Sequence, residues 1–460
     1  MTHLVPLSPG GLGAGTAGTG DASGPTAPTP PTAPPQDISG MLEGTELAGV
    51  SAASLAEEFG TPLFVYDLDL IERRVAALRN ALPSGFRIAF AVKATPALAV
   101  VAHLRRCGVG ADVASGGELE TVIRAGFEPS VIAMTGPGKR ESELAAAVAA
   151  GIGAVTVESA GELKRLESIA AAAGVRQPIL LRLAVTEDAR LETIRLIGGV
   201  EGKFGMPLST LTEAAHAAVA SPHLEIIGLH AFGASNVRDA DQLADHVSEL
   251  VAVARRVAAD AGFALRLVDA GGGLGIPYAD SERPLDLNRL GRRLAALRSG
   301  WDRDAATAEM EVVLEPGRFL VGPAGAYVAR VVDVKGPDSA PVAILDGGIN
   351  HVIRPALVRS EHRLAILAGS GVRALVPTTV AGPLCTGIDV FATRAMLPRP
   401  RLGDFVAVLD VGAYGFTESM PFFLSHPTAA EVAVKGGRAQ LIRSRITPAE
   451  LLERQTDPDW

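Results

Sequence analysis

Between residues 86 and 317 the apolar positions of the chain follow two alternating patterns. Short apolar runs typical of buried strands are each followed by longer segments whose apolar residues recur every three or four positions, as in amphipathic helices. Strands that alternate with helices in this way form parallel sheets, and eight such units close into an α/β barrel of the (β/α)8, or TIM, type. Eight strands are predicted, at residues 86–93, 110–115, 131–136, 154–159, 179–185, 224–232, 265–271 and 311–317.

The segments on either side of this region differ in character. Residues 1–40 are dominated by Gly, Pro, Thr, Ala and Ser, a composition that cannot bury enough apolar surface to offset chain entropy, so a disordered tail is expected. Beyond residue 325 short apolar runs are separated by Gly and Pro, which predicts a β-rich domain. We therefore assign residues 83–325 to the barrel, and residues 41–82 with 326–460 to the β-rich domain, to which the run PLFVYD contributes a strand.

Composition narrows the classes of function. The 460 residues are 48% hydrophobic, with a formal net charge of −9 and no cationic run, which argues against nucleic acid as a partner and favours a small polar substrate. Cys107 and Cys385 show neither disulfide nor metal-ligand spacing, so no metal site is expected and a reducing cytoplasm is the simplest location. No segment keeps about 18 uncharged apolar residues, the length that crossing a bilayer needs, so no membrane partner is expected.

Polar residues at three predicted strand ends are candidates for chemistry, because the active sites of barrels form where the strands end. Lys93 ends the first strand, where an amine in a low dielectric loses its proton more readily and can form an imine. The glycines of VDAGGGLG follow the seventh strand and would let backbone N–H groups approach a phosphate. Glu315 and Arg318 follow the eighth, and could meet a protonated pyridine nitrogen and a phosphate. Taken singly, each also has an ordinary structural interpretation: a strand-end lysine, a tight turn or a surface ion pair.

Eleven segments, in order along the chain, resemble those of one enzyme family. They are AVKAT, GADVASGGELE, TGPGK, KFG, GLHAFGASN, DAGGGLG, LEPGR, DGGINHVIRPAL, GPLCTGIDVF, VGAYG and HPTAAEV. In these segments the chain resembles the group IV, fold-type III pyridoxal-phosphate-dependent decarboxylases, which include diaminopimelate, ornithine and arginine decarboxylases. The resemblance implies an alanine-racemase-like barrel with a C-terminal β-rich domain, pyridoxal 5'-phosphate as the cofactor, and decarboxylation of an amino acid.

The resemblance also implies roles for individual residues. Lys93 is expected to hold the cofactor as a Schiff base, Glu315 to keep its pyridine nitrogen protonated, and Asp112 to lie close to both the cofactor and Lys93. The phosphate is expected to be bound by residues from three parts of the chain: Gly271, Gly272, Gly273, Arg318 and Tyr414, with Ser235 nearby.

Members of this family usually form head-to-tail homodimers whose sites lie between the subunits. The resemblance therefore implies that Cys385 and Asp389 complete the site of the partner subunit. Free cysteine thiols have a pKa of about 8.5, so a thiol is largely protonated at neutral pH and could return a proton to the α-carbon after carbon dioxide leaves. An isolated cysteine is more simply an inert buried residue, but the segment GPLCTGID favours the catalytic interpretation.

Several departures from the family pattern fall in the substrate pocket. Phe232 replaces the second histidine of an HxH segment, so an aromatic stack on the cofactor survives, whereas His230 matches the first histidine. Thr386 replaces an acidic residue that meets the distal ammonium of dibasic substrates, which argues against ornithine, lysine and diaminopimelate. Arg354 matches a substrate-carboxylate arginine, but Val358 replaces the tyrosine after it. These departures are similar to those of a branch in secondary metabolism that includes decarboxylases of amino acids tethered to acyl carrier proteins.

Two alternatives remain open. An amino acid racemase on the same barrel would use a tyrosine as the opposing base, where this chain has Cys385, and it would release no carbon dioxide. A catalytically silent relative would bind cofactor only to regulate a partner. The joint presence of Lys93, Glu315 and Cys385 favours the enzyme over the silent relative.

Overall fold

The computed structural model describes residues 40–184, 202–358, 362–367 and 373–458. Apart from Gly40, the predicted tail at residues 1–40 lies outside this part of the chain. In the described residues no helix is both long enough and apolar enough to cross a bilayer.

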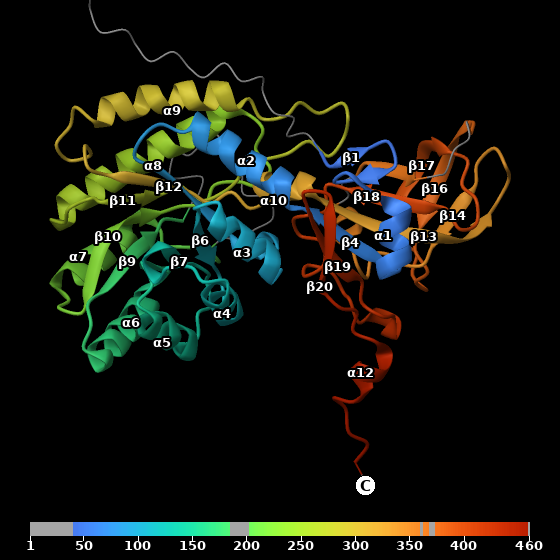
Figure 1. Ribbon diagram of the computed structural model, residues 1–460. Coiled ribbons are helices and arrows are strands. Elements are labelled where there is room, and N and C mark those ends of the chain that lie inside the picture. The colour runs from blue at the N-terminus through green and yellow to red at the C-terminus, as the bar shows by residue number, and fades with distance from the viewer. Residues whose placement is uncertain (1–39, 185–201, 359–361, 368–372, 459–460) are drawn as a thin grey trace, which may run out of the picture. The chain divides into compact units, whose positions relative to one another are not determined.

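Eight parallel strands close into a barrel (Figure 1), in the order β10-β11-β12-β5-β6-β7-β8-β9. This confirms the (β/α)8 prediction, because each of the eight predicted runs overlaps one barrel strand; seven contain their strand entirely, and β9 begins two residues before its predicted run. Lys93 lies just beyond the first of them, in the short 3-10 turn η1 (Val92–Ala94). The strands are β5 (Phe86–Ala91), β6 (Gly110–Val113), β7 (Ile132–Met134), β8 (Ala154–Val157), β9 (Gln177–Arg182), β10 (Leu224–His230), β11 (Leu267–Asp269) and β12 (Glu311–Leu314).

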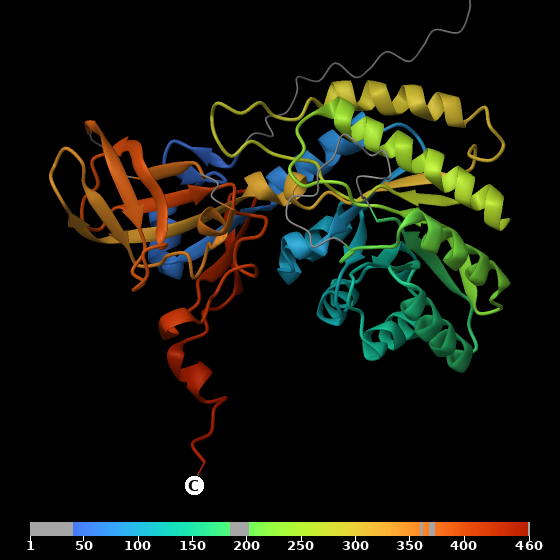
Figure 2. The same ribbon diagram turned by 180° about the vertical axis from the view of Figure 1, so that it is seen from behind.

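Helices surround the barrel, and each packs against its neighbours in the ring (Figures 1 and 2). The helix that precedes the first barrel strand, α2, closes this ring between α9 and α3. The ring helices are α2 (Leu68–Ala81), α3 (Leu98–Arg106), α4 (Gly116–Arg124), α5 (Glu141–Ala150), α6 (Ala160–Ala173), α7 (Leu208–Ala220), α8 (Ala240–Ala261) and α9 (Leu287–Trp301).

Local sequence sets where these helices begin and end. Ser115 and Ser159 directly follow strand segments, and their hydroxyls accept hydrogen bonds from the backbone N–H groups three residues on, at 3.2 Å and 3.1 Å. Such caps satisfy an N–H group that has no partner inside the helix. Gly174 ends α6 with a φ of +68°, a left-handed conformation that glycine adopts without the steric cost of a Cβ. Caps of this kind fix the residues at which these helices begin and end.

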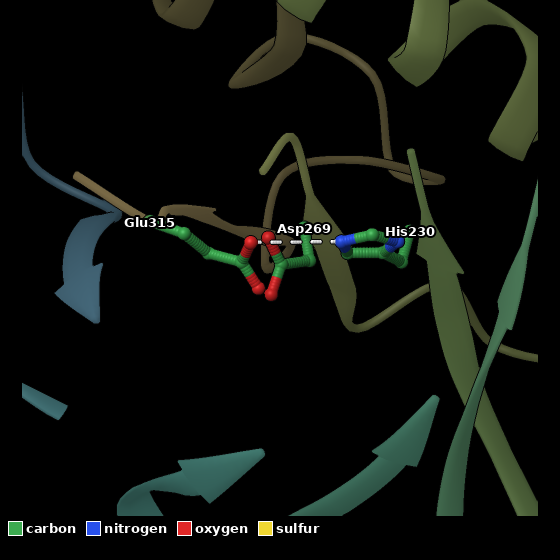
Figure 3. A group of neighbouring side chains, drawn as sticks. All are labelled: His230, Asp269 and Glu315. Atoms are coloured by element: carbon green, nitrogen blue, oxygen red, sulfur yellow. Dashed lines mark ion pairs between the residues drawn. The ribbon is translucent and has the colours of Figure 1, made fainter. Parts of the chain in front are cut away.

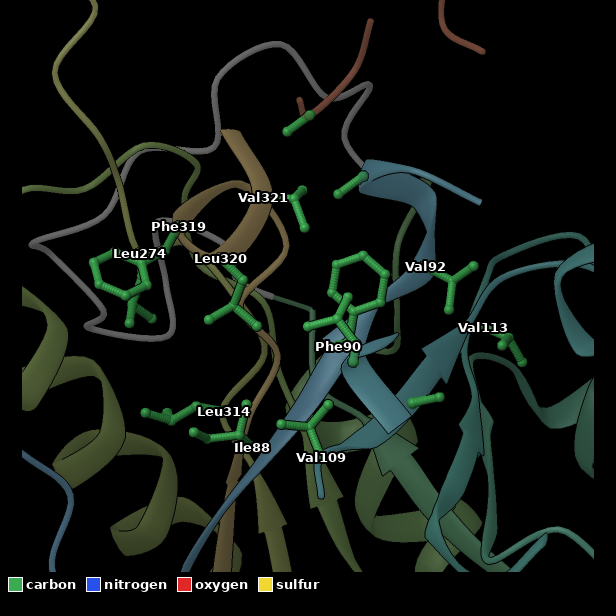
Figure 4. Packing of buried hydrophobic residues seen from close by; sticks show 14 of the residues in the cluster. Ile88, Phe90, Val92, Val109, Val113, Leu274, Leu314, Phe319, Leu320 and Val321 are labelled. Carbon is green, nitrogen blue, oxygen red and sulfur yellow. The ribbon is translucent and has the colours of Figure 1, made fainter. Parts of the chain in front are cut away.

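The main hydrophobic core lies between the strands and the helix ring. Ile88 and Phe90 of β5 belong to this core, together with Leu314 and Leu320 (Figure 4). Successive side chains of a strand point to opposite faces, so the intervening Ala89 faces the barrel interior, where it belongs to a separate small cluster. Phe90 is fully buried, and replacing such a residue by alanine typically costs about 3–5 kcal/mol.

A second, mixed β-sheet follows the barrel, as the sequence predicted. The run PLFVYD forms β4 (Leu63–Asp67), which pairs antiparallel with β13 and parallel with β19. In sheet order the strands are β17 (Val390–Pro398), β16 (Leu375–Ala381), β14 (Val342–Leu345), β13 (Gly325–Lys335), β4, β19 (Ala430–Lys435) and β20 (Arg438–Arg443), while β18 (Phe405–Leu409) pairs with β13 and with β15 (Leu364–Leu367).

Shorter elements complete the described chain, and one hydrogen bond links the two parts near Lys93. The backbone N–H of Tyr414 donates to the carbonyl of Ala94 at 2.8 Å, so the segment after β18 lies against the turn that carries Lys93. The shorter elements are β1 (Leu42–Glu43), β2 (Glu46–Leu47), β3 (Val50–Ser51), α1 (Ala52–Phe59), η2 (Pro129–Val131), α10 (Arg318–Val321), η4 (Gly322–Ala324), α11 (Arg354–Val358), η5 (Phe423–Ser425) and α12 (Pro448–Leu452).

Candidate active site

Lys93 stands at the carboxyl end of the barrel beside a buried carboxylate. Its Nζ lies 3.1 Å from Oδ2 of Asp112, and its side chain is 42% exposed whereas that of Asp112 is 1% exposed. The other oxygen of Asp112 accepts a hydrogen bond from the Thr135 hydroxyl at 2.7 Å. Burial lowers the pKa of Lys93, but the negative charges of Asp112 and Glu315 outweigh it and raise that pKa above its ordinary value. The expectation that this amine loses its proton easily is therefore wrong for the protein without cofactor.

Three ionisable groups meet at the ends of β10, β11 and β12 (Figure 3): His230, Asp269 and Glu315. All three are buried, and their polar atoms lie within 4.8 Å of one another. His230 Nε2 lies 3.6 Å from a Glu315 oxygen. Asp269 Oδ1 accepts the backbone N–H of Gly271 at 2.9 Å, so the same carboxyl also holds the start of the glycine turn.

The two carboxyl groups of this cluster have opposite charge states. Burial raises the pKa of Asp269 well above its ordinary value, and the neighbouring negative charge of Glu315 raises it further. Burial would also raise the pKa of Glu315, but His230, Lys93 and a hydrogen bond with Asp269 lower it to about 2. Asp269 is therefore the protonated partner and donates its hydrogen bond to an ionised Glu315.

The glycines after β11 form a turn with no room for side chains. Gly271 and Gly273 have φ values of +66° and +101°. A Cβ on Gly272 would lie 2.5 Å from the backbone oxygen of Glu315, and one on Gly273 would lie 2.6 Å from that of Ala234. Only glycine allows this close approach of backbone to backbone, and such turns expose N–H groups to an anion.

Arg318 lies beside the glycine turn and provides a cation for the same anion. One of its terminal nitrogens donates to the Ser235 hydroxyl at 3.1 Å, and the other donates to the Tyr278 hydroxyl. Its guanidinium also lies 4.8 Å from the ring centroid of Tyr414. Its buried Nε has no hydrogen-bond partner among the described residues, and an unpaired buried donor of this kind is stabilised by an anionic ligand.

Arg354 also contacts the Tyr414 ring. Its guanidinium is 5.1 Å from the ring centroid, and it forms an ion pair with Glu418 at 3.3 Å. Tyr414 itself has a φ of +58°, so its backbone conformation is unusual for a residue with a Cβ. The substrate arginine predicted from the sequence thus lies near the predicted phosphate residues, because it and Arg318 contact the same aromatic ring.

One cavity gathers most of the predicted cofactor residues. Asp112 does not line this cavity, but it forms an ion pair with Lys93, which does. The lining residues named as site residues are Lys93, Phe232, Ser235, Gly272, Gly273, Glu315, Arg318 and Tyr414, joined by Ala91, Asn236, Leu274 and Gly317.

Besides Asp112, five predicted residues are not among those that line this cavity: Gly271, Arg354, Cys385, Thr386 and Asp389. Cys385 is exposed on the loop between β16 and β17. Asp389 is 3% exposed, and its carboxylate accepts backbone N–H groups from Ile349 at 2.8 Å and Leu384 at 2.7 Å. In this chain the Asp389 carboxylate is therefore occupied in holding the loop that carries Cys385.

Sequence reasoning missed three contributors to the site. Asp269 was quoted in the segment DAGGGLG but received no role, although an acidic residue at the end of a barrel strand is a recognisable signal. Thr135, which donates to Asp112, opens the segment TGPGK but received no role. Tyr278, which binds Arg318, stands in no distinctive local pattern and carries no signal of its own.

Comparisons with known proteins agree with this geometry. Residues 68–322 match the family model described as "Pyridoxal-dependent decarboxylase, pyridoxal binding domain". The diaminopimelate decarboxylase of Aquifex aeolicus is 33% identical over 414 residues, which cover 89% of this chain and 95% of that protein. The L-glutamyl-(BtrI acyl-carrier protein) decarboxylase of Niallia circulans is 31% identical over 409 residues, 87% of this chain and 95% of that protein. The crystal structure of diaminopimelate decarboxylase from M. jannaschii with L-lysine superposes with a TM-score of 0.84 at 26% identity, covering 92% of this chain and 98% of that one.

Proposed function

Since the chain belongs to the pyridoxal-dependent decarboxylases and is an amino acid decarboxylase that uses pyridoxal 5'-phosphate, we propose a role for each residue of its site and a carrier-bound amino acid as its substrate. The observation that carries the substrate proposal is the neutral Thr386 after Cys385, at the position where the family's dibasic substrates meet an acidic group.

The residues of the cavity fit this cofactor. The glycine turn has no space for a Cβ, and Arg318 keeps one buried donor without a partner, which suits a phosphate. Lys93 offers an amine for covalent attachment of the aldehyde. Glu315 is an ionised carboxylate in a buried position, which suits a protonated pyridine nitrogen. Phe232 lines the same cavity and offers a ring face.

The residues of the site would then have separate roles in the reaction. When bound, the cofactor supplies an electron sink for the charge that carbon dioxide leaves on the α-carbon. His230 and Asp269 lower the pKa of Glu315, so its carboxylate would favour a proton on the ring nitrogen of the bound cofactor. Asp112 lies 3.1 Å from the Lys93 amine. It would hold that amine in place whenever the amine is not attached to the cofactor. Arg318, Ser235 and the glycines anchor the phosphate end.

We also propose that two subunits share each site. Cys385 is exposed and does not line the cavity of its own chain, so it would serve as proton donor in the cavity of a partner. Mixing a Lys93→Ala variant with a Cys385→Ala variant tests this directly. The mixture should reach about a quarter of native activity, above that of either variant alone, because half of the dimers are mixed and one of their two sites is intact. Mixtures that stay inactive after subunit exchange would rule out shared sites.

The chemistry at the α-carbon restricts how an amino acid substrate can be attached to a carrier. Decarboxylation requires a free α-carboxylate and a free α-amine, so a carrier can be attached only through the side chain of the amino acid. In dibasic substrates that distal end carries an ammonium, whereas in a tethered substrate it is a neutral thioester on a pantetheine arm. A neutral Thr386 suits the second case.

The surroundings of Arg354 point the same way. Ile353 donates its N–H to the hydroxyl of Ser419 at 3.0 Å, which fixes the helix start of α11 beside the segment that contains Met420. The apolar side chains Leu357, Val358, Met420, Phe422, Phe423 and Leu424 are exposed around this point. The methyl and methylene groups of a pantetheine arm can contact such a surface, and the Niallia circulans relative acts on a glutamyl group attached to a carrier protein.

The deciding experiment compares free and tethered substrates on the cofactor-loaded protein. Free diaminopimelate, ornithine, lysine, arginine and glutamate are assayed for carbon dioxide release beside carriers bearing glutamyl or aspartyl groups through their side-chain carboxyl. We expect turnover of a tethered substrate to exceed that of every free amino acid by at least tenfold in kcat/KM. A preference for a free diamino acid would refute the proposal.

A pair of variants checks the role assigned to Thr386. Thr386→Glu restores a negative charge and should increase kcat/KM for a free dibasic amino acid while lowering it for the tethered substrate. Thr386→Gln has nearly the same size without the charge, so it serves as the matched control and should produce neither effect.

A further inference from the structure

The floor of the barrel, opposite the cofactor end, is hollow. Barrel interiors are normally filled by layers of bulky branched side chains. Here four consecutive strands, β5 to β8, contribute Ala89, Gly110, Ala133 and Ala154 at the level below the site, and all four line one cavity. On the other side of the barrel Leu267 and Val313 have larger side chains and belong to the same small interior cluster as Ala89 and Ala154.

The resulting cavity has a volume of about 860 Å³ and an ionic rim. Arg87 and Glu311 lie 3.4 Å apart at this rim, with side chains 46% and 45% exposed. Arg266 and Glu225 form a second exposed ion pair there. The outer end of the cavity is therefore polar and open to solvent, whereas its walls are apolar.

The inner end of this floor cavity is formed by Asp269. Asp269 does not line the cofactor cavity, but its hydrogen-bond partner Glu315 does. The hydrogen bond between the two carboxyl groups is thus the boundary between the two cavities. Besides Glu315, the ionisable groups near Asp269 are His230 and Asp112, and His246 of α8 contacts the next carbonyl, that of Ala270, at 3.0 Å.

Water is the occupant that this cavity suits. Apolar cavities stay dry when nothing inside can hydrogen-bond, but water enters a space that offers polar partners and enough room. The floor cavity provides a carboxyl group at its inner end and two ion pairs at its outer end. Its volume is far above that of one water molecule.

We propose that the floor cavity is a water-filled shaft through which Asp269 exchanges its proton with solvent, independently of the mouth where substrate binds. In the exchange the O–H bond of Asp269 breaks as an O–H bond forms on a water molecule of the shaft, and a hydronium ion in the shaft then returns a proton to Asp269. The net result is that one proton of Asp269 is replaced by one from solvent while Glu315 stays ionised, and each step is reversible. Asp269 can therefore exchange its proton while a bulky substrate covers the mouth.

The first test measures access to the shaft in the holoenzyme. Ala154→Cys and Val155→Cys are made in a background carrying Cys107→Ala and Cys385→Ala, and the native proteins are treated with methyl methanethiosulfonate. Both positions are nearly inaccessible, but Ala154 lines the shaft whereas Val155 faces the main core. We expect the thiol at position 154 to react at least tenfold faster, as measured by mass spectrometry. Equal protection of both, or equal reaction of both, would overturn the proposal.

The second test follows the proton itself. The C=O stretch of a protonated carboxyl group moves when its hydrogen is replaced by deuterium, and the band of Asp269 is identified by its absence in Asp269→Asn. After mixing the holoenzyme with D2O, filling the shaft with Ala133→Leu and Ala154→Leu together should slow this shift at least tenfold. The control Val155→Ile, on the opposite face of the same strand, should leave the rate unchanged. An unaltered rate in the filled variant would contradict the proton route.

Discussion

Replacing Asp269 by asparagine should remove a pH dependence from the stability of the protein. The folded-state pKa of Asp269 is raised well above its ordinary value by burial and by Glu315, whereas in the unfolded chain an aspartate has a pKa of about 3.9. The stability that Asp269 contributes is therefore complete below about pH 3.9 and is lost as the pH rises toward the folded-state pKa. Asparagine is neutral at every pH, and it can still donate to Glu315 and accept from Gly271.

The magnitude follows from the proton count. Above about pH 4 the unfolded chain loses the Asp269 proton, whereas the raised pKa makes the folded chain hold it more tightly. The free energy of unfolding therefore falls with rising pH, by at most about 1.4 kcal/mol per pH unit from this group alone. Glu315, whose pKa is lowered to about 2, does not titrate between pH 5 and pH 6. The difference in unfolding free energy, Asp269→Asn minus native, should accordingly rise from pH 5 to pH 6, by at most about 1.4 kcal/mol.

Chemical denaturation of the cofactor-free chain at both pH values measures this difference. Trp301 stacks on Phe86 with ring centroids 6.3 Å apart, so its fluorescence reports unfolding of the barrel. Other titrating groups are common to both proteins and cancel in the comparison. A difference that does not change with pH would show that Asp269 is ionised in the folded state, and the assignment of the proton to Asp269 would be wrong.

Three further predictions concern the cofactor site. Gly272→Ala should weaken cofactor binding at least tenfold in equilibrium titration, because the new Cβ would lie 2.5 Å from the Glu315 carbonyl. The control Gly300→Ala, whose Cβ would have no neighbour within 4 Å, should bind the cofactor normally. Equal affinities of the two variants would refute the role of the glycine turn in binding the phosphate. Glu315→Gln should lower kcat by about 10²–10³-fold while covalently bound cofactor remains visible in the absorption spectrum, and undiminished turnover would contradict its role. Cys385→Ala should slow release of the amine product more than Cys385→Ser, which keeps a proton donor, in single-turnover product analysis; identical behaviour of both variants would argue against proton transfer by the thiol.

The sequence predicted the barrel because its strands are buried on both faces. The runs IAFAV and VVL, which contain Ile88 and Leu314, are continuously apolar. Other barrel strands are followed by helices that begin at a capping serine, as at Ser115 and Ser159, so period and punctuation agree. The cofactor residues were also predictable, since Lys93 and Glu315 directly follow such runs and the strand ends of a barrel converge. The features that depend on a local sequence pattern were therefore predicted correctly.

Charge states and cavities were not predictable in this way. The raised pKa of Asp269 depends on its burial and on how closely Glu315 approaches it, and these two residues are far apart in the sequence. The raised pKa of Lys93 depends likewise on Asp112, which lies in a different strand. The floor cavity arises from small residues on four separate strands, each unremarkable within its own run. These properties are set by contacts that only the closed barrel creates.

Borohydride reduction of the purified holoenzyme, followed by peptide mass spectrometry, tests the central claim most directly. The reaction fixes the cofactor on whichever amine holds it, and we predict a pyridoxyl phosphate group on Lys93. Lys139 is an internal comparison, because its buried Nζ is engaged by Glu162 at 2.7 Å and by the carbonyl of Gly136 and should remain unlabelled. A label on Lys139 or any other lysine, or no label at all, would contradict the assignment of the active site.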